Sequence, residues 1–125
     1  MAKILLIDDD DGIRGTARAI LESAGHVVSE ASDGAQGMEL FEGSDFDLVI
    51  TDLYMPGKEG IETIQDVLDR GSGVPILAMS GGGGGGGGAL VDAEMLGASA
   101  TLKKPFTAAQ LRDTVAHLLA GGRGG

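Results

Sequence analysis

The sequence contains no cysteine, no tryptophan and four aromatic residues in all, one Tyr and three Phe. Without cysteine, the chain can form no disulfide and offers no thiolate to a metal ion. So few aromatic rings provide no platform on which nucleic acid bases could stack. The 19 acidic residues outnumber the 9 Lys and Arg, and the net charge is −10. Because nucleic acid binding depends on Lys and Arg, we expect no direct nucleic acid contact, and partners that are proteins, cations or phosphorylated donors.

Long hydrophobic runs are also absent. No apolar run approaches the roughly 20 residues that a membrane-spanning helix needs. The apolar run near the N-terminus, Ile4–Ile7, is too short for a signal peptide. We therefore expect no membrane partner and, together with the lack of cysteine, a cytoplasmic location.

Short apolar runs alternate along the chain with amphipathic stretches. The runs predict five strands, at residues 3–8, 26–31, 47–52, 74–80 and 99–104. They are apolar almost throughout, which is typical of parallel strands covered on both faces. Helical spacing of apolar residues predicts helices around residues 13–24, 35–41, 61–68 and 108–119, whose apolar stripes include Ala24, Ala35, Leu68 and Ala108. The last has a capping box, Thr107 with Gln110, and Gly25 and Gly71 follow the first and third as C-terminal stops.

The glycine run Gly81–Gly88 interrupts this pattern. Eight glycines would cost a helix roughly 8 kcal/mol relative to alanine, so we expect a flexible loop there. The fourth helix then begins no earlier than Ala89. The run matches G-x-G-x-x-G, as any polyglycine does, but lacks the Lys-Ser/Thr of a phosphate-binding loop. The sequence thus predicts one doubly wound α/β domain of five strands and five helices over residues 1–120, with a flexible Gly-rich tail at 121–125.

Polar side chains stand where four of the predicted strands end. Asp8 and Asp9 end the first strand, Asp52 the third, Ser80 the fourth and Lys104 the fifth. In open parallel sheets, ligands bind beyond the carboxyl ends of the strands. If the first and third strands are neighbours, three carboxylates meet, which is unfavourable unless a cation lies between them. Mg²⁺ prefers such oxygen ligands, so we expect a magnesium site.

Simpler interpretations exist for each of these residues. Asp10 and Asp11 fit a helix start, where Asp is stabilised by the helix dipole, and we favour that interpretation for this pair. An EF-hand loop is excluded, because the position of its first Asp falls on Ile7. Asp52 and Ser80 could each act as local caps and Lys104 could be a surface charge. Their joint placement at strand ends favours a shared site.

Four segments, "ILLIDDD", "DLVITDLYMPGKEGIE", "VPILAMS" and "GASATLKKPF", together resemble the receiver domain of two-component response regulators. The resemblance extends from Lys3 to about Ala120. It implies a flavodoxin-like fold with strand order 2-1-3-4-5. It also implies a signalling domain, rather than an enzyme with a separate substrate, that promotes its own phosphorylation and dephosphorylation. The partners implied are a sensor histidine kinase or phosphotransfer protein and an unidentified downstream protein.

The resemblance assigns roles position by position. Asp52 is the expected phosphoacceptor and the nucleophile toward a phosphohistidine. Asp8 and Asp9 are the expected Mg²⁺ ligands, with Asp52 and the backbone carbonyl of Tyr54. Lys104 and Ser80 would each contact a phosphoryl oxygen. The resemblance also implies a cis peptide bond between Lys104 and Pro105, as is usual in that family.

Two features depart from the family pattern. The fifth strand usually carries an aromatic switch residue, and Thr101 occupies that position. The polyglycine run replaces the loop and first turn of the fourth helix. Ser80 and Thr101 remain the expected switch residues, but both changes affect the usual output surface. No output domain follows, so we expect either a stand-alone receiver or a fragment of a longer regulator, with Met1 a natural start.

Two other functions are compatible with parts of the sequence. A haloacid-dehalogenase-type phosphatase would use Asp9 as nucleophile in a D-x-D-G motif with Asp11 and Gly12. Such enzymes need a further acidic pair after the lysine, and Asp113 alone follows Lys104. A degenerate receiver that binds partners without phosphorylation is the second alternative, and the intact acidic trio argues against it.

Overall fold

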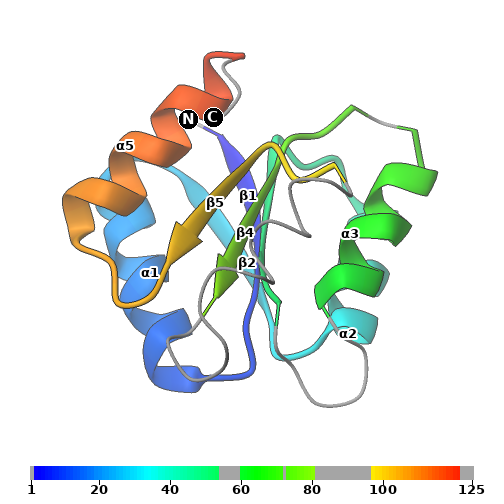
Figure 1. Ribbon diagram of the computed structural model, residues 1–125, viewed down its shortest axis with the longest axis horizontal. Coiled ribbons are helices and arrows are strands. Elements are labelled where there is room, and N and C mark those ends of the chain that lie inside the picture. Colours follow the sequence, from blue (N-terminus) through cyan, green and yellow to red (C-terminus); the bar gives the residue numbers. More distant parts are fainter. Residues whose placement is uncertain (1, 54–59, 72, 81–96, 122–125) are drawn as a thin grey trace.

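The structure is a computed structural model that describes residues 2–53, 60–71, 73–80 and 97–121 (Figure 1). Its strands are β1 (Lys3–Ile7), β2 (Val27–Ala31), β3 (Leu48–Asp52), β4 (Ile76–Ser80) and β5 (Ala100–Lys103). Its helices are α1 (Asp11–Ser23), α2 (Gly34–Gly43), α3 (Gly60–Asp69) and α5 (Ala108–Leu119). Each strand lies within its predicted range. The polyglycine loop and the predicted helix from Ala89 lie outside the described residues, as do residues 122–125 of the predicted tail.

The five strands form one parallel sheet in the order β2-β1-β3-β4-β5. This confirms the doubly wound fold and the strand order that the resemblance implied. In the register between β1 and β3, Ile7 lies beside Thr51. The next residues, Asp8 and Asp52, therefore stand side by side where the two strands end.

Helices cover both faces of the sheet, α1 and α5 on one face and α2 and α3 on the other (Figure 1). Successive residues of β1 alternate between the two cores, with Ile4 and Leu6 toward α1 and α5 and Leu5 and Ile7 toward α2 and α3. Because both faces are buried, the strand is apolar at each of its four buried positions, Ile4–Ile7, as the sequence showed.

The helix ends are formed by the residues that the sequence predicted. The Asp10 side chain caps α1, and Thr107 and Gln110 form the capping box of α5. Gly25 and Gly71 have φ angles of 94° and 68°, a region in which glycine is favoured. The Lys104–Pro105 peptide bond is cis.

Four residues of the predicted apolar helix stripes, Ala24, Ala35, Leu68 and Ala108, are exposed rather than buried. Ala35, expected to face the core, is exposed, whereas Gly37 is buried. A Cβ atom at Gly37 would lie 2.4 Å from the Cδ1 atom of Ile7, so α2 approaches the sheet more closely there than a side chain allows. Leu68, the last residue of the predicted stripe of α3, is 43% exposed.

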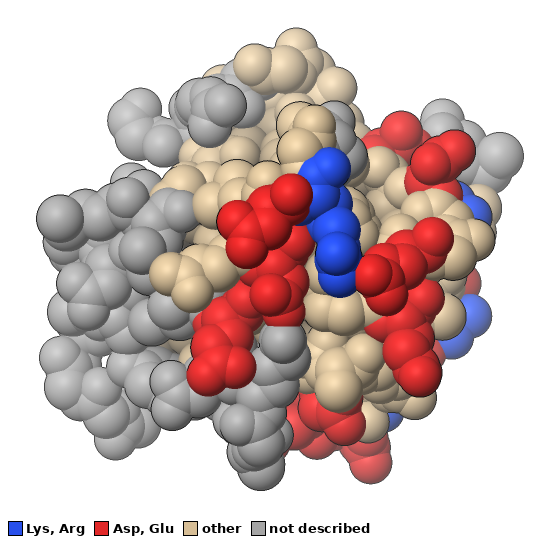
Figure 2. All heavy atoms as spheres, turned by 90° about the vertical axis from the view of Figure 1, so that its right-hand side faces the viewer, with Lys and Arg blue, Asp and Glu red and all other residues tan. Residues whose placement is uncertain are grey.

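Acidic side chains gather over α2 and α3, as Figure 2 shows. These two helices contain five acidic residues and no Lys or Arg among their described positions: Glu39, Glu42, Glu62, Asp66 and Asp69. A surface of this charge repels phosphate groups. None of the helices in the described part of the chain is long and apolar enough to cross a membrane.

Candidate phosphoacceptor and metal site

The acidic turn after β1 gives each of its four carboxylates a different environment. Asp8 is fully buried, and its Oδ1 atom accepts a hydrogen bond from the backbone N–H of Asp10 at 2.9 Å. Its Oδ2 atom accepts a hydrogen bond from Lys104 Nζ at 2.7 Å. A buried carboxylate that is paired and hydrogen-bonded in this way is compatible with the interior of the domain.

The next carboxylates in the turn serve the start of α1. Asp10 Oδ1 accepts a hydrogen bond from the backbone N–H of Ile13 at 3.0 Å, which confirms the predicted helix cap. Asp11 is the first residue of the helix, and its Oδ1 atom pairs with Arg14 Nη2 at 2.5 Å. Asp10 and Asp11 thus belong to the helix start rather than to a shared acidic site.

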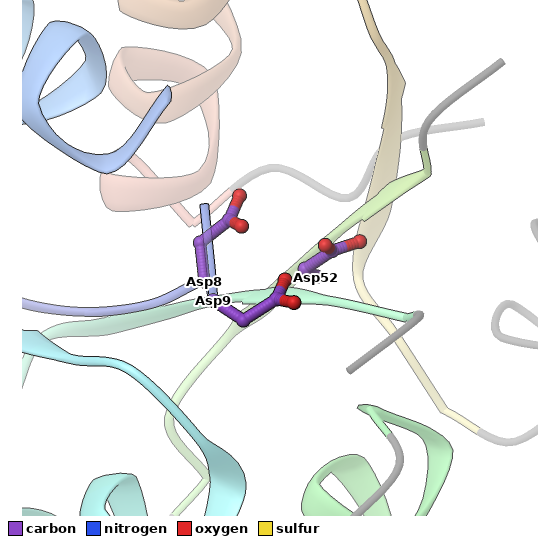
Figure 3. A group of neighbouring side chains, drawn as sticks. All are labelled: Asp8, Asp9 and Asp52. Carbon is purple, nitrogen blue, oxygen red and sulfur yellow. The ribbon is translucent and has the colours of Figure 1, made fainter. Parts of the chain in front are cut away.

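Asp9 differs from its three neighbours. It is exposed, and its carboxylate has no hydrogen bond or ion pair with any described residue. Carboxylate oxygens of Asp8, Asp9 and Asp52 nevertheless lie within 4.8 Å of one another. The three side chains come from the adjoining ends of β1 and β3, as Figure 3 shows. The structure therefore brings together the three acids that the sequence grouped.

Lys104 connects this cluster to the end of β5. Its Nζ atom donates to Asp8 Oδ2 at 2.7 Å and to Asp52 Oδ2 at 3.2 Å, and the residue is 8% exposed. Burial by itself would lower the pKa of Lys104. The hydrogen bond to Asp8 and the charges of both carboxylates outweigh that effect, so the pKa of Lys104 is raised and the side chain stays protonated at neutral pH.

The remaining predicted site residues lie nearby or outside the described region. Ser80 is buried at the end of β4, and its backbone carbonyl accepts a hydrogen bond from the Lys104 N–H at 2.8 Å. Thr101 is half-buried on β5 and pairs with Ala78 of β4. Tyr54, the expected carbonyl ligand, lies outside the described residues.

The charges of the cluster match a divalent cation. Among the described residues, three carboxylates face one ammonium group, which gives the cluster an excess of two negative charges. All the candidate side-chain ligands are carboxylate oxygens, the donors that Mg²⁺ prefers. The donor set and the charge therefore fit Mg²⁺.

One residue near the site was missed by the sequence interpretation. Arg14 of α1 donates from Nη1 to the backbone carbonyl of Asp8 at 2.7 Å and from Nε to Glu30 Oε1 at 3.0 Å. The spacing of Asp11 and Arg14 could have indicated their pairing, since residues three apart face each other on a helix. The contacts with Asp8 and Glu30 depend on the packing of α1 beside β1 and β2, which no local pattern reveals.

Comparison with known proteins decides the family. The model of the response regulator receiver domain matches residues 4–116. The chemotaxis protein CheY of Halobacterium salinarum is 31% identical over 120 residues, which cover 95% of this chain and 98% of that protein. The chain belongs to the response regulator receiver domain family. Receiver domains are signalling domains of two-component systems, associated with histidine kinases and downstream effectors.

Further relatives and solved structures differ in the share of their own length that this receiver domain covers. The sensory/regulatory protein RpfC of Xanthomonas campestris is 33% identical over 120 residues, but the chain spans 16% of that protein. The structure of CheY4 from Vibrio cholerae has a TM-score of 0.85 and 29% identity, covering 94% of this chain and 98% of CheY4. The structure of a response regulator receiver domain protein from Clostridium thermocellum has a TM-score of 0.87 and 28% identity, covering 97% of this chain and 96% of that protein. The receiver domain thus corresponds to a whole small protein in some relatives and to a small part of a larger one in another.

Proposed function

We propose that this receiver domain accepts a phosphoryl group on Asp52 from the phosphohistidine of a sensor kinase or phosphotransfer protein, with Mg²⁺ bound beside it. The observation that carries the proposal is the position of Lys104 Nζ, which donates to both Asp8 and Asp52 at the edge of the Asp8, Asp9 and Asp52 cluster. Phosphoryl transfer needs mainly positioning and neutralisation of charge, and this arrangement offers both.

The carboxylates of Asp8, Asp9 and Asp52 would hold the ion, and the Tyr54 carbonyl is the fourth proposed ligand. When bound, Mg²⁺ would neutralise the repulsion between these carboxylates and the oxygens of the incoming phosphoryl group. Asp9 is the strongest candidate for a direct ligand, because it is exposed and its carboxylate has no partner among the described residues.

Asp52 is the proposed nucleophile. One of its carboxylate oxygens would attack phosphorus while the P–N bond to the donor imidazole breaks and its electron pair passes to the imidazole nitrogen. Asp52 stands at the end of β3 and is 5% exposed, and Lys104 Nζ donates to its Oδ2 atom, which positions the carboxylate. After transfer, the Lys104 ammonium would donate to a phosphoryl oxygen in place of the Asp52 carboxylate, as expected for a protonated amine next to both groups.

The output step would begin on β4 and β5. Ser80 is the last residue of β4 and Lys104 directly follows β5, and the Lys104 N–H is hydrogen-bonded to the Ser80 carbonyl. A phosphoryl oxygen that draws the Ser80 hydroxyl and the Lys104 ammonium inward would shift both strand ends together, and with them Thr101 on β5. We propose that this movement changes the surface offered to a downstream protein.

The experiment that tests the phosphoacceptor is incubation with acetyl phosphate and Mg²⁺, followed by intact-mass measurement. We expect one adduct of about 80 Da, the mass of a phosphoryl group, and its loss in Asp52→Ala. Asp45→Ala is a suitable control, because that aspartate is exposed and lies outside the cluster. No adduct on the wild-type domain, with acetyl phosphate or with a phosphorylated kinase, would support the degenerate receiver instead.

The phosphatase alternative predicts the opposite pattern of labelling, lost in Asp9→Asn and retained in Asp52→Ala. The structure offers this alternative little support. Asp11, the second acid of its motif, pairs with Arg14 and is not part of the acidic cluster.

The Mg²⁺ site has a separate test in thermal unfolding. A ligand that binds the folded state stabilises it by about 1.4 kcal/mol when its concentration is ten times Kd. We expect millimolar Mg²⁺ to raise the melting temperature of the wild-type domain and to have little effect on Asp9→Asn. Equal shifts in both proteins would contradict the assignment of Asp9 as a ligand.

A further inference from the structure

Arg14 joins three segments at the edge of the acidic site. Its side chain, 16% exposed, reaches from α1 to the backbone carbonyl of Asp8 with Nη1 and to Glu30 of β2 with Nε. Its Nη2 atom pairs with Asp11. A guanidinium group can make several planar hydrogen bonds at once, so one side chain here fixes the relative positions of α1, the end of β1 and β2.

The contact with Asp8 acts on the peptide bond that leads to Asp9. The Asp8 N–H donates to the Ala31 carbonyl at 3.1 Å, and both Asp8 carboxylate oxygens are hydrogen-bonded, so that residue is held on every side. Its carbonyl belongs to the planar peptide unit shared with Asp9. A donor that holds this oxygen therefore fixes the peptide plane that contains the Asp9 N and Cα atoms, and so constrains the position from which the Asp9 side chain begins.

Glu30 holds the arginine in place. Its Oε1 atom pairs with Arg14 Nε, and its Oε2 atom pairs with Arg18 Nη1. The Glu30 side chain is 27% exposed, so this contact is more shielded from water than the Arg14–Asp11 pair, in which Asp11 is 87% exposed. Arg18 shares Glu30 and the helix with Arg14, but among the described residues its ion pairs are with Glu22 and Glu30 and not with the acidic turn.

We propose that Arg14, held by Glu30, is a positioning residue for metal binding: it orients the Asp8–Asp9 peptide so that the Asp9 carboxylate faces Asp8 and Asp52. This inference rests on the proposed Mg²⁺ site. It assigns to Arg14 an action through the backbone, with no direct contact with the ion or the phosphoryl group.

Charge and geometry make opposite predictions for the loss of Arg14. Arg14 is a cation close to a cation site, so its removal should tighten Mg²⁺ binding if its charge were its only influence. If it positions Asp9, its removal should weaken binding, since groups that orient metal ligands typically contribute tenfold or more to affinity. The sign of the change therefore separates the two effects.

The test is Mg²⁺ binding by isothermal titration calorimetry to the wild type, Arg14→Met and the matched control Arg18→Met. We expect Arg14→Met to raise Kd about tenfold and Arg18→Met to change it less than twofold. The amide ¹⁵N shift of Asp9 without Mg²⁺ should move in Arg14→Met and stay unchanged in Arg18→Met, because its nitrogen shares the peptide unit with the Asp8 carbonyl.

The outcomes distinguish this inference from the function on which it rests. A wild-type domain that binds no Mg²⁺ would contradict the proposed metal site. A wild-type domain that binds Mg²⁺, with Arg14→Met binding it equally or more tightly, would overturn the role of Arg14 alone. If Arg14→Met does not fold, Arg14→Lys retains the charge and the aliphatic stem but not the forked contacts. It should still weaken Mg²⁺ binding several-fold, and an unchanged Kd would overturn the inference.

Discussion

At the carboxyl ends of β1, β3 and β5, three charged side chains are buried, whereas charged side chains at the amino ends of the sheet lie nearer to water. Asp8, Asp52 and Lys104 are the buried charged residues in the described part of the chain. At the other end, Asp47 is exposed and accepts a hydrogen bond from the Lys3 N–H at 2.8 Å. The Lys3 ammonium lies 5.2 Å from the centre of the Phe46 ring.

The difference shows where the fold gives up stability for chemistry. Burying a charge is unfavourable, and its attraction to a buried partner repays that cost only with good geometry. The amino ends avoid this cost, because their charged groups remain hydrated. At the carboxyl ends the charges are buried, and the result is a preorganised site in which three carboxylates lie around one ammonium group.

The largest effect is expected from a substitution of Lys104 that removes its ion pairs with Asp8 and Asp52. We expect Lys104→Met to lower the free energy of unfolding by about 3 kcal/mol without Mg²⁺, because it leaves two buried carboxylates without their cation. Lys3→Met, at the amino end, should cost less than about 1 kcal/mol, the usual contribution of an exposed cation–π contact. Urea denaturation of both variants measures the difference. Similar losses in the two variants would show that the ends of the sheet do not differ as described.

A smaller effect concerns the packing beneath the acidic turn. Gly37→Ala would place a methyl group 2.4 Å from the Cδ1 atom of Ile7, the residue before Asp8. We expect a loss of about 1–3 kcal/mol from this overpacking. Gly15→Ala, in α1, is the control, since a Cβ atom there has no neighbour within 4 Å. That change should stabilise the domain by up to about 1 kcal/mol through helix propensity. Thermal unfolding that gave both variants the same sign would refute the close contact.

The smallest effect is a pH dependence at Glu30. Hydrogen bonding to Arg18, and also to Arg14, lowers the pKa of Glu30 below its ordinary 4.5, although burial acts in the opposite direction. Because the folded pKa lies below the unfolded one, the stabilisation is complete above pH 4.5 and is lost as the pH falls through the folded value. We therefore expect the wild type to lose more stability than Glu30→Gln on acidification below that pH.

The matched control for this acid titration is Glu39→Gln, which removes an exposed carboxylate on α2. Its stability should fall in parallel with the wild type when both are followed by urea denaturation at a series of pH values. If Glu30→Gln also ran parallel to the wild type, the ion pairs of Glu30 would not contribute to folding.

Much of the fold could be predicted because its signals are local. The five strands followed from apolar runs, and the cap at Asp10 and the capping box of Thr107 and Gln110 followed from residue types at fixed spacing. The position of Gly37 against the sheet could not be predicted in this way. Helical periodicity suggested Ala35 for the buried face, and the close approach of α2 to Ile7 depends on how the helix packs.

The candidate site was predictable in its members but not in their contacts. Acids at the ends of two strands indicated a cluster, since parallel strands end at the same edge of a sheet. The sequence already assigned Asp10 and Asp11 to the helix start, whereas the ion pair of Asp8 with Lys104 is visible in the structure alone. Arg14 itself was overlooked, because a side chain that holds a backbone carbonyl leaves no pattern in the sequence.

The sequence by itself determined which segments form strands and helices and which residue types stand where the strands end. These properties depend on hydrophobic periodicity and on hydrogen bonds between near neighbours. The tertiary structure decided that β1 lies between β2 and β3, and that Lys104 reaches Asp8, 96 residues away, and Asp52, 52 residues away. Contacts at such separations exist only after strand order and register are fixed, because these bring distant charges within hydrogen-bonding distance.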